Sequence, residues 1–101
     1  MNTDADTVIL EDTSTTTRLA PLYKVLLHND DITPVEVVIA ILARIFYKNA
    51  KDAIGIMLTA HNEGIALVEI LPLEQAEFKV EQAHSISHGH QYPLTFSIEE
   101  A

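Results

Sequence analysis

The turn Asn29-Asp30-Asp31 holds the residue types in this sequence that are best suited to binding a ligand. It lies between an apolar stretch and Thr33-Pro34, a pair that can begin a helix, so we expect a loop at one edge of a sheet. Amide and carboxylate oxygens together suit an ammonium group, which offers three donors and a positive charge. A second interpretation stays open, because Asx-rich turns often bond only to their own backbone.

An enzymatic role for this turn is not expected. The two aspartates could act as an acid and base pair, but no nucleophile or metal-ligand partner is obviously placed for them in the sequence. The chain has no cysteine, which excludes a thiol nucleophile and a thiolate metal site. We therefore expect a non-catalytic binding protein that needs no cofactor.

The composition limits the partners. The chain has 101 residues, enough for one domain, and 48% of them are apolar. Six basic and fifteen acidic residues give a net charge of −9, which disfavours nucleic acids and anionic membranes. No apolar run is long enough to span a bilayer, and the first residues lack the order of a signal peptide. We expect a soluble, cytoplasmic monomer with neutral or cationic partners.

The first twenty residues differ in character from the rest. They are rich in acidic and hydroxyl side chains and carry no base before Arg18. This composition predicts a disordered N-terminal extension over residues 1–20 and a folded core over residues 21–101.

Hydrophobic periodicity and capping residues predict six elements in the core. Thr33 offers a capping hydroxyl and Pro34 a suitable first residue for one helix, while Asn49 and Gly64 would begin and end the next. The elements are expected as a strand over 22–28, helices over 34–47 and 50–63, a strand over 65–71, a helix over 73–88 and a strand over 92–98. This β-α-α-β-α-β order predicts an α+β two-layer sandwich, in which a three-stranded, mainly antiparallel sheet packs on three helices.

Motifs in fixed order resemble those of a known family. They are YKVLLHNDDITP at 23–34, MLTAHNEG at 57–64, EQAEFKV at 74–80 and YPL at 92–94. Together they closely resemble the ClpS adaptors, and the resemblance spans residues 22–101. ClpS proteins bind the N-terminal residue of substrate proteins, the N-degron, and deliver those substrates to a ClpA- or ClpC-type AAA+ unfoldase for degradation by ClpP. The resemblance implies the same role here.

The resemblance also assigns roles to particular residues. It implies that Asn29, Asp30 and His61 bind the free α-amino group of the substrate. It implies that the pocket for the first side chain is formed by Leu27, Asp31, Thr33, Val35, Val38, Met57, Ala60 and Leu94. Glu74 and Lys79 stand where the family contacts the N-terminal domain of the unfoldase.

Two pocket positions depart from the family pattern. Many ClpS proteins have Met in place of Val35 and Val in place of Ala60, and an aromatic residue often stands in place of Ile32. Because both pocket changes make the side chain smaller, we expect a pocket of altered shape. The family's usual preference for Leu, Phe, Tyr and Trp therefore cannot be transferred whole.

Two other functions stay open. His84, His88 and His90 could together face a metal ion if the third helix continues that far, although Gly89 is expected to disturb that geometry and a solvated helix end is the plainer interpretation. A metal-binding module is the alternative from another class. Within the adaptor class, the alternative is a regulator that docks on the unfoldase and delivers few substrates.

Overall fold

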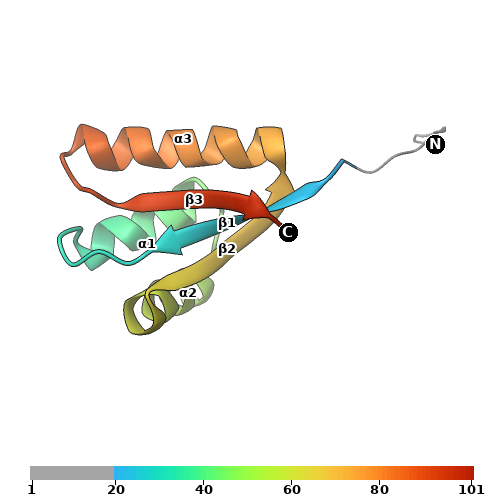
Figure 1. The fold of residues 1–101 in the computed structure, drawn as a ribbon. Coiled ribbons are helices and arrows are strands. Elements are labelled where there is room, and N and C mark those ends of the chain that lie inside the picture. The colour runs from blue at the N-terminus through green and yellow to red at the C-terminus, as the bar shows by residue number, and fades with distance from the viewer. Residues whose placement is uncertain (1–19) are drawn as a thin grey trace.

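The computed structural model describes residues 20–101, so the extension expected over residues 1–20 lies outside the described part except for its last residue. The elements are β1 (Leu22–His28), α1 (Val35–Arg44), α2 (Ala50–Glu63), β2 (Ile65–Pro72), α3 (Leu73–Gly89) and β3 (Thr95–Glu100), as Figure 1 shows. Their order and type confirm the predicted β-α-α-β-α-β fold. No helix in this part of the chain is long and apolar enough to cross a membrane.

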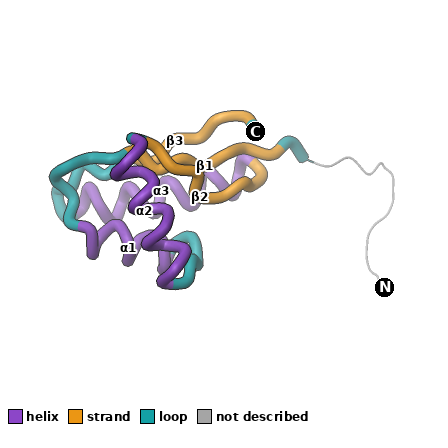
Figure 2. Tube along the Cα trace, turned by 90° about the horizontal axis from the view of Figure 1, so that it is seen from below, coloured by secondary structure: helices purple, strands orange, loops and turns teal. Residues whose placement is uncertain are grey.

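The three strands form one sheet in the order β2-β1-β3, and both pairings are antiparallel. The register of β1 with β2 shifts between Val25 and Leu26, where a bulge interrupts the ladder. Figure 2 shows the helices on one side of the sheet. The molecule is therefore the two-layer sandwich that the sequence predicts.

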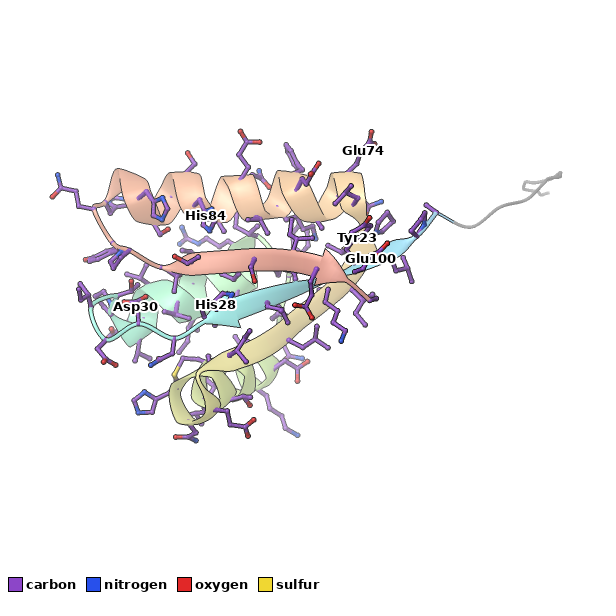
Figure 3. All side chains as sticks on the ribbon, viewed as in Figure 1. Tyr23, His28, Asp30, Glu74, His84 and Glu100 are labelled. Carbon is purple, nitrogen blue, oxygen red and sulfur yellow. The ribbon has the colours of Figure 1, made fainter. Side chains whose placement is uncertain are left out.

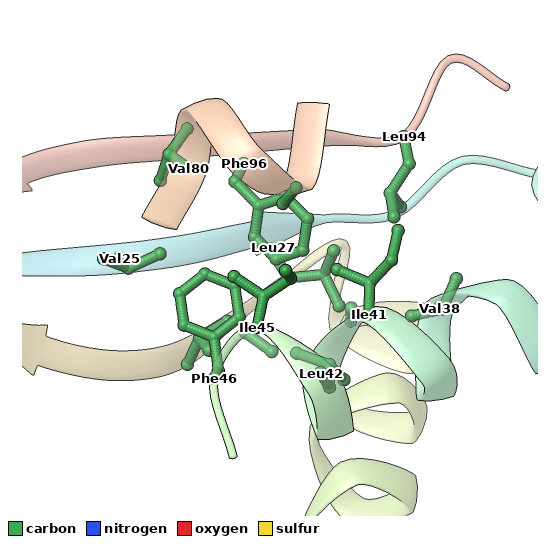
Figure 4. Close-up of a cluster of buried hydrophobic side chains, with 14 of the residues drawn as sticks. Val25, Leu27, Val38, Ile41, Leu42, Ile45, Phe46, Val80, Leu94 and Phe96 are labelled. Carbon is green, nitrogen blue, oxygen red and sulfur yellow. The ribbon is translucent and has the colours of Figure 1, made fainter. Parts of the chain in front are cut away.

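The core lies between the sheet and the three helices, and α1 contributes the largest side chains on the helical side. Val25 and Leu27 of β1 are fully buried, and Phe96 of β3 meets Phe46 with ring centroids 5.4 Å apart (Figure 4). The apolar stripe predicted for the first helix is buried as a whole; its members are Val38, Ile41, Leu42, Ile45 and Phe46. Side chains of this size gain about 1.5–3 kcal/mol each on full burial, so the stripe fixes α1 against the sheet.

The start of α1 differs from the prediction. Pro34 is the N-cap, with extended φ and ψ of −60° and 144°, and the helix begins at Val35. The Thr33 hydroxyl caps nothing in the helix, because it donates a hydrogen bond to Asp30 Oδ2 at 3.0 Å. The helix also ends at Arg44 rather than near Tyr47, whose φ of 56° is incompatible with a continuing right-handed helix.

The limits of α2 confirm the prediction. Asn49 is the N-cap, and its Oδ1 accepts a hydrogen bond from the Asp52 N–H at 2.8 Å. Gly64 follows the last turn with a φ of 90°, the left-handed conformation that glycine adopts without a steric penalty. These two caps fix where α2 ends.

The last strand begins later than predicted, at Thr95 rather than residue 92. Gln91 has a φ of 66°, and Pro93 has no N–H to offer a neighbouring strand. The Tyr92 N–H donates instead to the Ser87 carbonyl at 2.8 Å. Residues 90–94 are therefore a tight connection between α3 and β3.

Candidate functional site

A cavity of about 50 Å³ opens where β1 ends, β3 begins, and α1 and α2 meet the sheet. Its lining comes from segments that are far apart in the sequence: Leu27, His28, Asn29, Asp30, Thr33, Val35, Val38, Met57, Ala60, His61 and Leu94. Every residue that the sequence assigned to an N-terminus pocket is among them except Asp31. The site is thus a product of the fold, with polar groups from one loop and one helix end beside apolar groups from the core.

Asp30 is held by its own turn. Its Oδ1 accepts hydrogen bonds from the N–H groups of Ile32 and Thr33 at 2.8 and 2.7 Å, and its Oδ2 accepts one from the Thr33 hydroxyl. This is the Asx-rich turn of the plainer interpretation. The bonds also orient the carboxylate, and an oxygen with two acceptor sites that uses one of them can still accept a further donor. The turn and a cation-binding role are therefore compatible.

Asn29 lies beside the end of α2. Its N–H donates to the Gly64 carbonyl at 3.0 Å, so the turn after β1 is joined directly to the C-terminus of that helix. His61, one turn earlier on α2, lines the same cavity and is exposed to solvent. The C-terminal end of a helix carries partial negative charge, which favours a cation at this edge of the cavity.

The other walls of the cavity are apolar. Leu27, Leu94 and Ala60 are almost completely buried, and Met57 is half-buried beside them. Val35 is 48% exposed, so it lies at the rim. The two small residues of the expected side-chain pocket therefore have different surroundings, because Ala60 forms a buried wall and Val35 an exposed edge.

Asp31 of the turn and His28 at the end of β1 differ from the expected lining of the cavity. Asp31 is exposed and does not line the cavity. His28 lines the cavity but was not among the residues that the sequence singled out. Its Nε2 bonds with Ser97 Oγ of the neighbouring strand at 2.6 Å. Nothing in the local sequence around His28 indicated this position, because its partner is 69 residues away.

The histidines near the end of α3 are engaged by the backbone. His84 Nε2 accepts a hydrogen bond from the Phe96 N–H at 2.9 Å, and His88 Nε2 bonds with the Leu94 carbonyl at 3.1 Å. Within residues 20–101, no group of three or more His, Asp or Glu side chains is placed to share a metal ion. Because both Nε2 atoms already have partners, a metal ion could bind at Nε2 of either ring only by displacing these bonds.

Glu74 and Lys79 lie on α3, away from the cavity. Glu74 is exposed in the first turn, near the start of β1, whereas Asp30 is at the other end of the sheet (Figure 3). Lys79 Nζ lies 4.8 Å from the ring centroid of Tyr47 and 5.8 Å from that of Phe46, a distance at which a cation is attracted to an aromatic ring. The two residues share one helix and are separate from the cavity.

Comparisons with known proteins agree on one family. The family model described as "ATP-dependent Clp protease adaptor protein ClpS" matches residues 18–97. An ATP-dependent Clp protease adapter protein ClpS from Roseobacter denitrificans is 46% identical over 97 residues, which cover 96% of this chain and 86% of the relative. One from Aromatoleum aromaticum is 41% identical over 95 residues, which cover 94% and 93%.

A solved structure is similar in three dimensions. Agrobacterium tumefaciens ClpS2, bound to L-phenylalaninamide, matches with a TM-score of 0.80 and 35% sequence identity. The match covers 82% of this chain and 100% of that one.

Proposed function

This chain belongs to the ClpS family of Clp protease adaptor proteins, and on that premise we propose that its cavity binds the N-terminal residue of substrate proteins. The α-amino group would lie against Asn29, Asp30 and His61, and the first side chain would enter between the apolar walls. The observation that carries this proposal is that both sets of residues line one cavity.

The polar edge suits an α-ammonium group. An α-amino group with an ordinary pKa of about 7.7–8.0 is mostly charged at neutral pH. It has three N–H donors, and the edge offers the oxygens of Asn29 and Asp30 together with a ring nitrogen of His61. A charge-assisted hydrogen bond contributes about 1.5–3 kcal/mol, so this edge would supply much of the affinity.

The ligand of the similar structure has the same two parts. L-phenylalaninamide, found on Agrobacterium tumefaciens ClpS2, carries a free α-amino group and an aromatic side chain. This supports a site in the present chain that takes an ammonium group and an apolar side chain together. Burying a large apolar side chain adds about 1.5–3 kcal/mol to the binding free energy of the ammonium group. After the cost of association is subtracted, we expect a dissociation constant of about 1 µM.

The size of the cavity bears on which side chains fit. Its volume of about 50 Å³ is well below the ~150 Å³ of an engineered protein cavity that holds benzene. A large first side chain would therefore need the rim to open, and the flexible Met57 and the exposed Val35 are the side chains placed to move. We accordingly propose a preference that differs from that of ClpS proteins with Met and Val at positions 35 and 60.

The second half of the function is delivery. We propose that the protein acts as a cytoplasmic monomer that docks on the N-terminal domain of a ClpA- or ClpC-type unfoldase through Glu74 and Lys79. Neither Glu74 nor Lys79 lines the cavity, and this supports the assignment, because substrate and unfoldase could bind at once. The adaptor itself would catalyse no reaction and need no cofactor.

A peptide series tests the binding proposal. Peptides with a free N-terminus that differ only in the first residue are titrated into the purified protein by calorimetry. Large apolar first residues should bind at about micromolar dissociation constants, and Asp, Glu or Lys at the first position should not. Tight binding to the unfoldase with no peptide bound at all would overturn the N-degron proposal and favour the unfoldase-docking regulator.

A further inference from the structure

Two imidazole rings join α3 to the start of β3. His84 Nε2 accepts from the Phe96 N–H, so this nitrogen carries no proton, and His88 Nε2 faces the Leu94 carbonyl, so it must carry one. The two rings are stacked, with centroids 4.9 Å apart and planes 10° from parallel. Figure 3 shows His84 between α3 and β3. We call this pair of side chains, His84 and His88, the imidazole clamp.

The clamp holds the backbone at a wall of the cavity. Leu94 is 2% exposed and its side chain belongs to the cavity lining. Its carbonyl is bound by His88, and the N–H bound by His84 belongs to the residue two positions further on. The preceding residues 90–93 form the tight connection after α3 and contain no regular ladder of hydrogen bonds to β1. The two imidazoles therefore bond the backbone at and just after Leu94, next to the point where Thr95 begins to pair with His28 of β1.

We propose that His84 and His88 are positioning residues for substrate binding, which fix the backbone on both sides of Thr95 and so hold Leu94 in the pocket wall. The inference rests on the proposed N-degron function only for its effect on affinity. The clamp itself is a property of the free protein, and its failure can be observed without any substrate.

Protonation of His84 would break the clamp. A protonated Nε2 would point an N–H at the Phe96 N–H, and two donors cannot bond to each other. Burial lowers the pKa of His84 below its usual value of 6.5, and the neighbouring His88 lowers it further. In the folded state the neutral, accepting ring is therefore favoured.

The groups around His84 are few. On α3 its neighbour is His88, and on β3 it faces the ring of Phe96 at 6.1 Å. His28 of β1 is bonded to Ser97, and the acidic Glu99 and Glu100 are at the far end of β3. Glu36 and Arg44 of α1 line a separate groove with Ile86. Among residues 20–101 neither imidazole forms an ion pair.

The sign of the pH effect follows from the lowered pKa. As the pH falls below 6.5, the unfolded chain takes up a proton at position 84 before the folded chain does. The stability that His84 contributes is therefore fully present above pH 6.5 and is lost as the pH falls through the folded pKa. The Leu94 wall should loosen over the same acidic range.

The first test needs no peptide. Nuclear magnetic resonance of the wild-type protein is followed from pH 8 to pH 5, with the His84 ring, the Phe96 amide and the Leu94 methyl groups observed. The amide and methyl signals should shift with the same midpoint as the His84 ring, below pH 6.5. Signals that stay constant while His84 titrates would overturn the proposal.

The second test separates two properties of His84, its hydrogen-bond acceptor and its ability to take up a proton. His84→Gln can place an amide oxygen near the Nε2 position and cannot titrate, whereas His84→Phe keeps bulk but removes the acceptor. At pH 7.5 the Gln variant should bind an N-degron peptide within about twofold of wild type, and the Phe variant about five- to tenfold more weakly, the effect of one lost hydrogen bond. His90→Gln, an exposed histidine at the end of the same helix, is the matched control and should behave as wild type.

The comparison of wild type with the His84→Gln variant also isolates the contribution of His84. Any contribution from another group is shared by both proteins, so only the part of the pH dependence that disappears in that variant belongs to the clamp. A folded His84→Phe variant that binds as wild type would overturn the proposal. If that variant does not fold, an unchanged pH profile in His84→Gln does so instead. Absence of any peptide binding to wild type would refute the proposed function, while the resonance titration would still decide on the clamp.

Discussion

Asp30 has both a structural role and a proposed binding role. Its carboxylate accepts three hydrogen bonds from its own turn, and it also lines the cavity in which the α-amino group is proposed to lie. Asp30→Asn keeps an oxygen for the turn but removes the charge. We expect peptide affinity to fall by about 10- to 100-fold, since a charge-assisted bond is worth roughly 1.5–3 kcal/mol, while the fold persists. Calorimetry with an N-degron peptide measures the change.

The matched comparison is Asp31→Asn, which removes the same charge from an exposed residue outside the cavity lining. The peptide affinity of the Asp31→Asn variant should change by less than about threefold. The charge of Asp31 is exposed to solvent and lies farther from the bound ammonium group than that of Asp30, so solvent and salt screen it more strongly. Equal losses in the two variants would mean that only the net charge of the loop matters, and would contradict a specific contact by Asp30.

Ala60 tests the buried wall. The residue is 2% exposed and lines the cavity, so the two added carbons of Ala60→Val must enter that cavity or displace Met57. We expect the variant to bind peptides with the largest first residues less well relative to those beginning with smaller apolar ones. Overpacking costs typically about 1–3 kcal/mol of stability, and here the cavity should keep the cost near the lower end. The peptide series measures the preference, and an unchanged ranking would contradict a contact between Ala60 and the ligand.

At the scale of single elements, the glycine inside α2 and the glycine that caps its C-terminus have opposite roles. Gly64 has a φ of 90°, a conformation that costs a residue with a Cβ roughly 1–2 kcal/mol, whereas Gly55 lies inside the helix. A Cβ at either position would meet nothing within 4 Å, so packing does not decide the outcome. We expect Gly64→Ala to lower the free energy of unfolding by about 1 kcal/mol or more, and Gly55→Ala to raise it by about 0.5–1 kcal/mol.

Urea denaturation of the two variants measures these changes. Each serves as the other's control, because both add one methyl group, either within α2 or at its C-cap. Effects of the same sign would contradict the left-handed cap at Gly64. Because the Gly64 carbonyl accepts from the Asn29 N–H, the Gly64 variant should also weaken peptide binding, and Gly55→Ala should not.

The sequence predicted the ends of helices and strands correctly where contacts between residues close in the chain fix those ends. The caps of α2 are bonds between residues three or four apart, and both were predicted correctly. At α1 the predicted cap was wrong, because the Thr33 hydroxyl has another possible partner nearby in the sequence. It donates a hydrogen bond to the Asp30 carboxylate and does not cap a helix N–H. The start of β3 was placed too early, because the apolar residues at 92–94 belong to a connection held by Ser87 and His88.

The residues of the candidate site could likewise be grouped only in part from local sequence patterns. Periodicity alone could not bring Asn29 near Gly64 or place Leu94 in the same cavity, since these contacts join distant segments. The resemblance to the ClpS family supplied the grouping, and the cavity contains it except for Asp31. Neither approach indicated the bonds of His84 and His88, because their partners are determined by how α3 lies on β3.

At the scale of the whole molecule, the proposed substrate and unfoldase surfaces are separate. Asp30 and Glu74 lie near opposite ends of the sheet (Figure 3). Lys79→Ala should therefore weaken binding to the purified N-terminal domain of the unfoldase by about 5- to 30-fold, the range of a moderate interface contact, and leave peptide affinity unchanged. Lys51→Ala, an exposed lysine on α2, is the matched control. Loss of peptide binding in the Lys79 variant would contradict the separation of the two surfaces.

The proposed function depends above all on binding of a charged α-amino group at the polar edge of the cavity. The most direct test is calorimetric titration of one apolar-first peptide in two forms, with a free and with an acetylated N-terminus. Acetylation removes the positive charge and a donor but keeps the first side chain, so we expect at least about a 100-fold loss of affinity. Equal affinity for the two forms would contradict it.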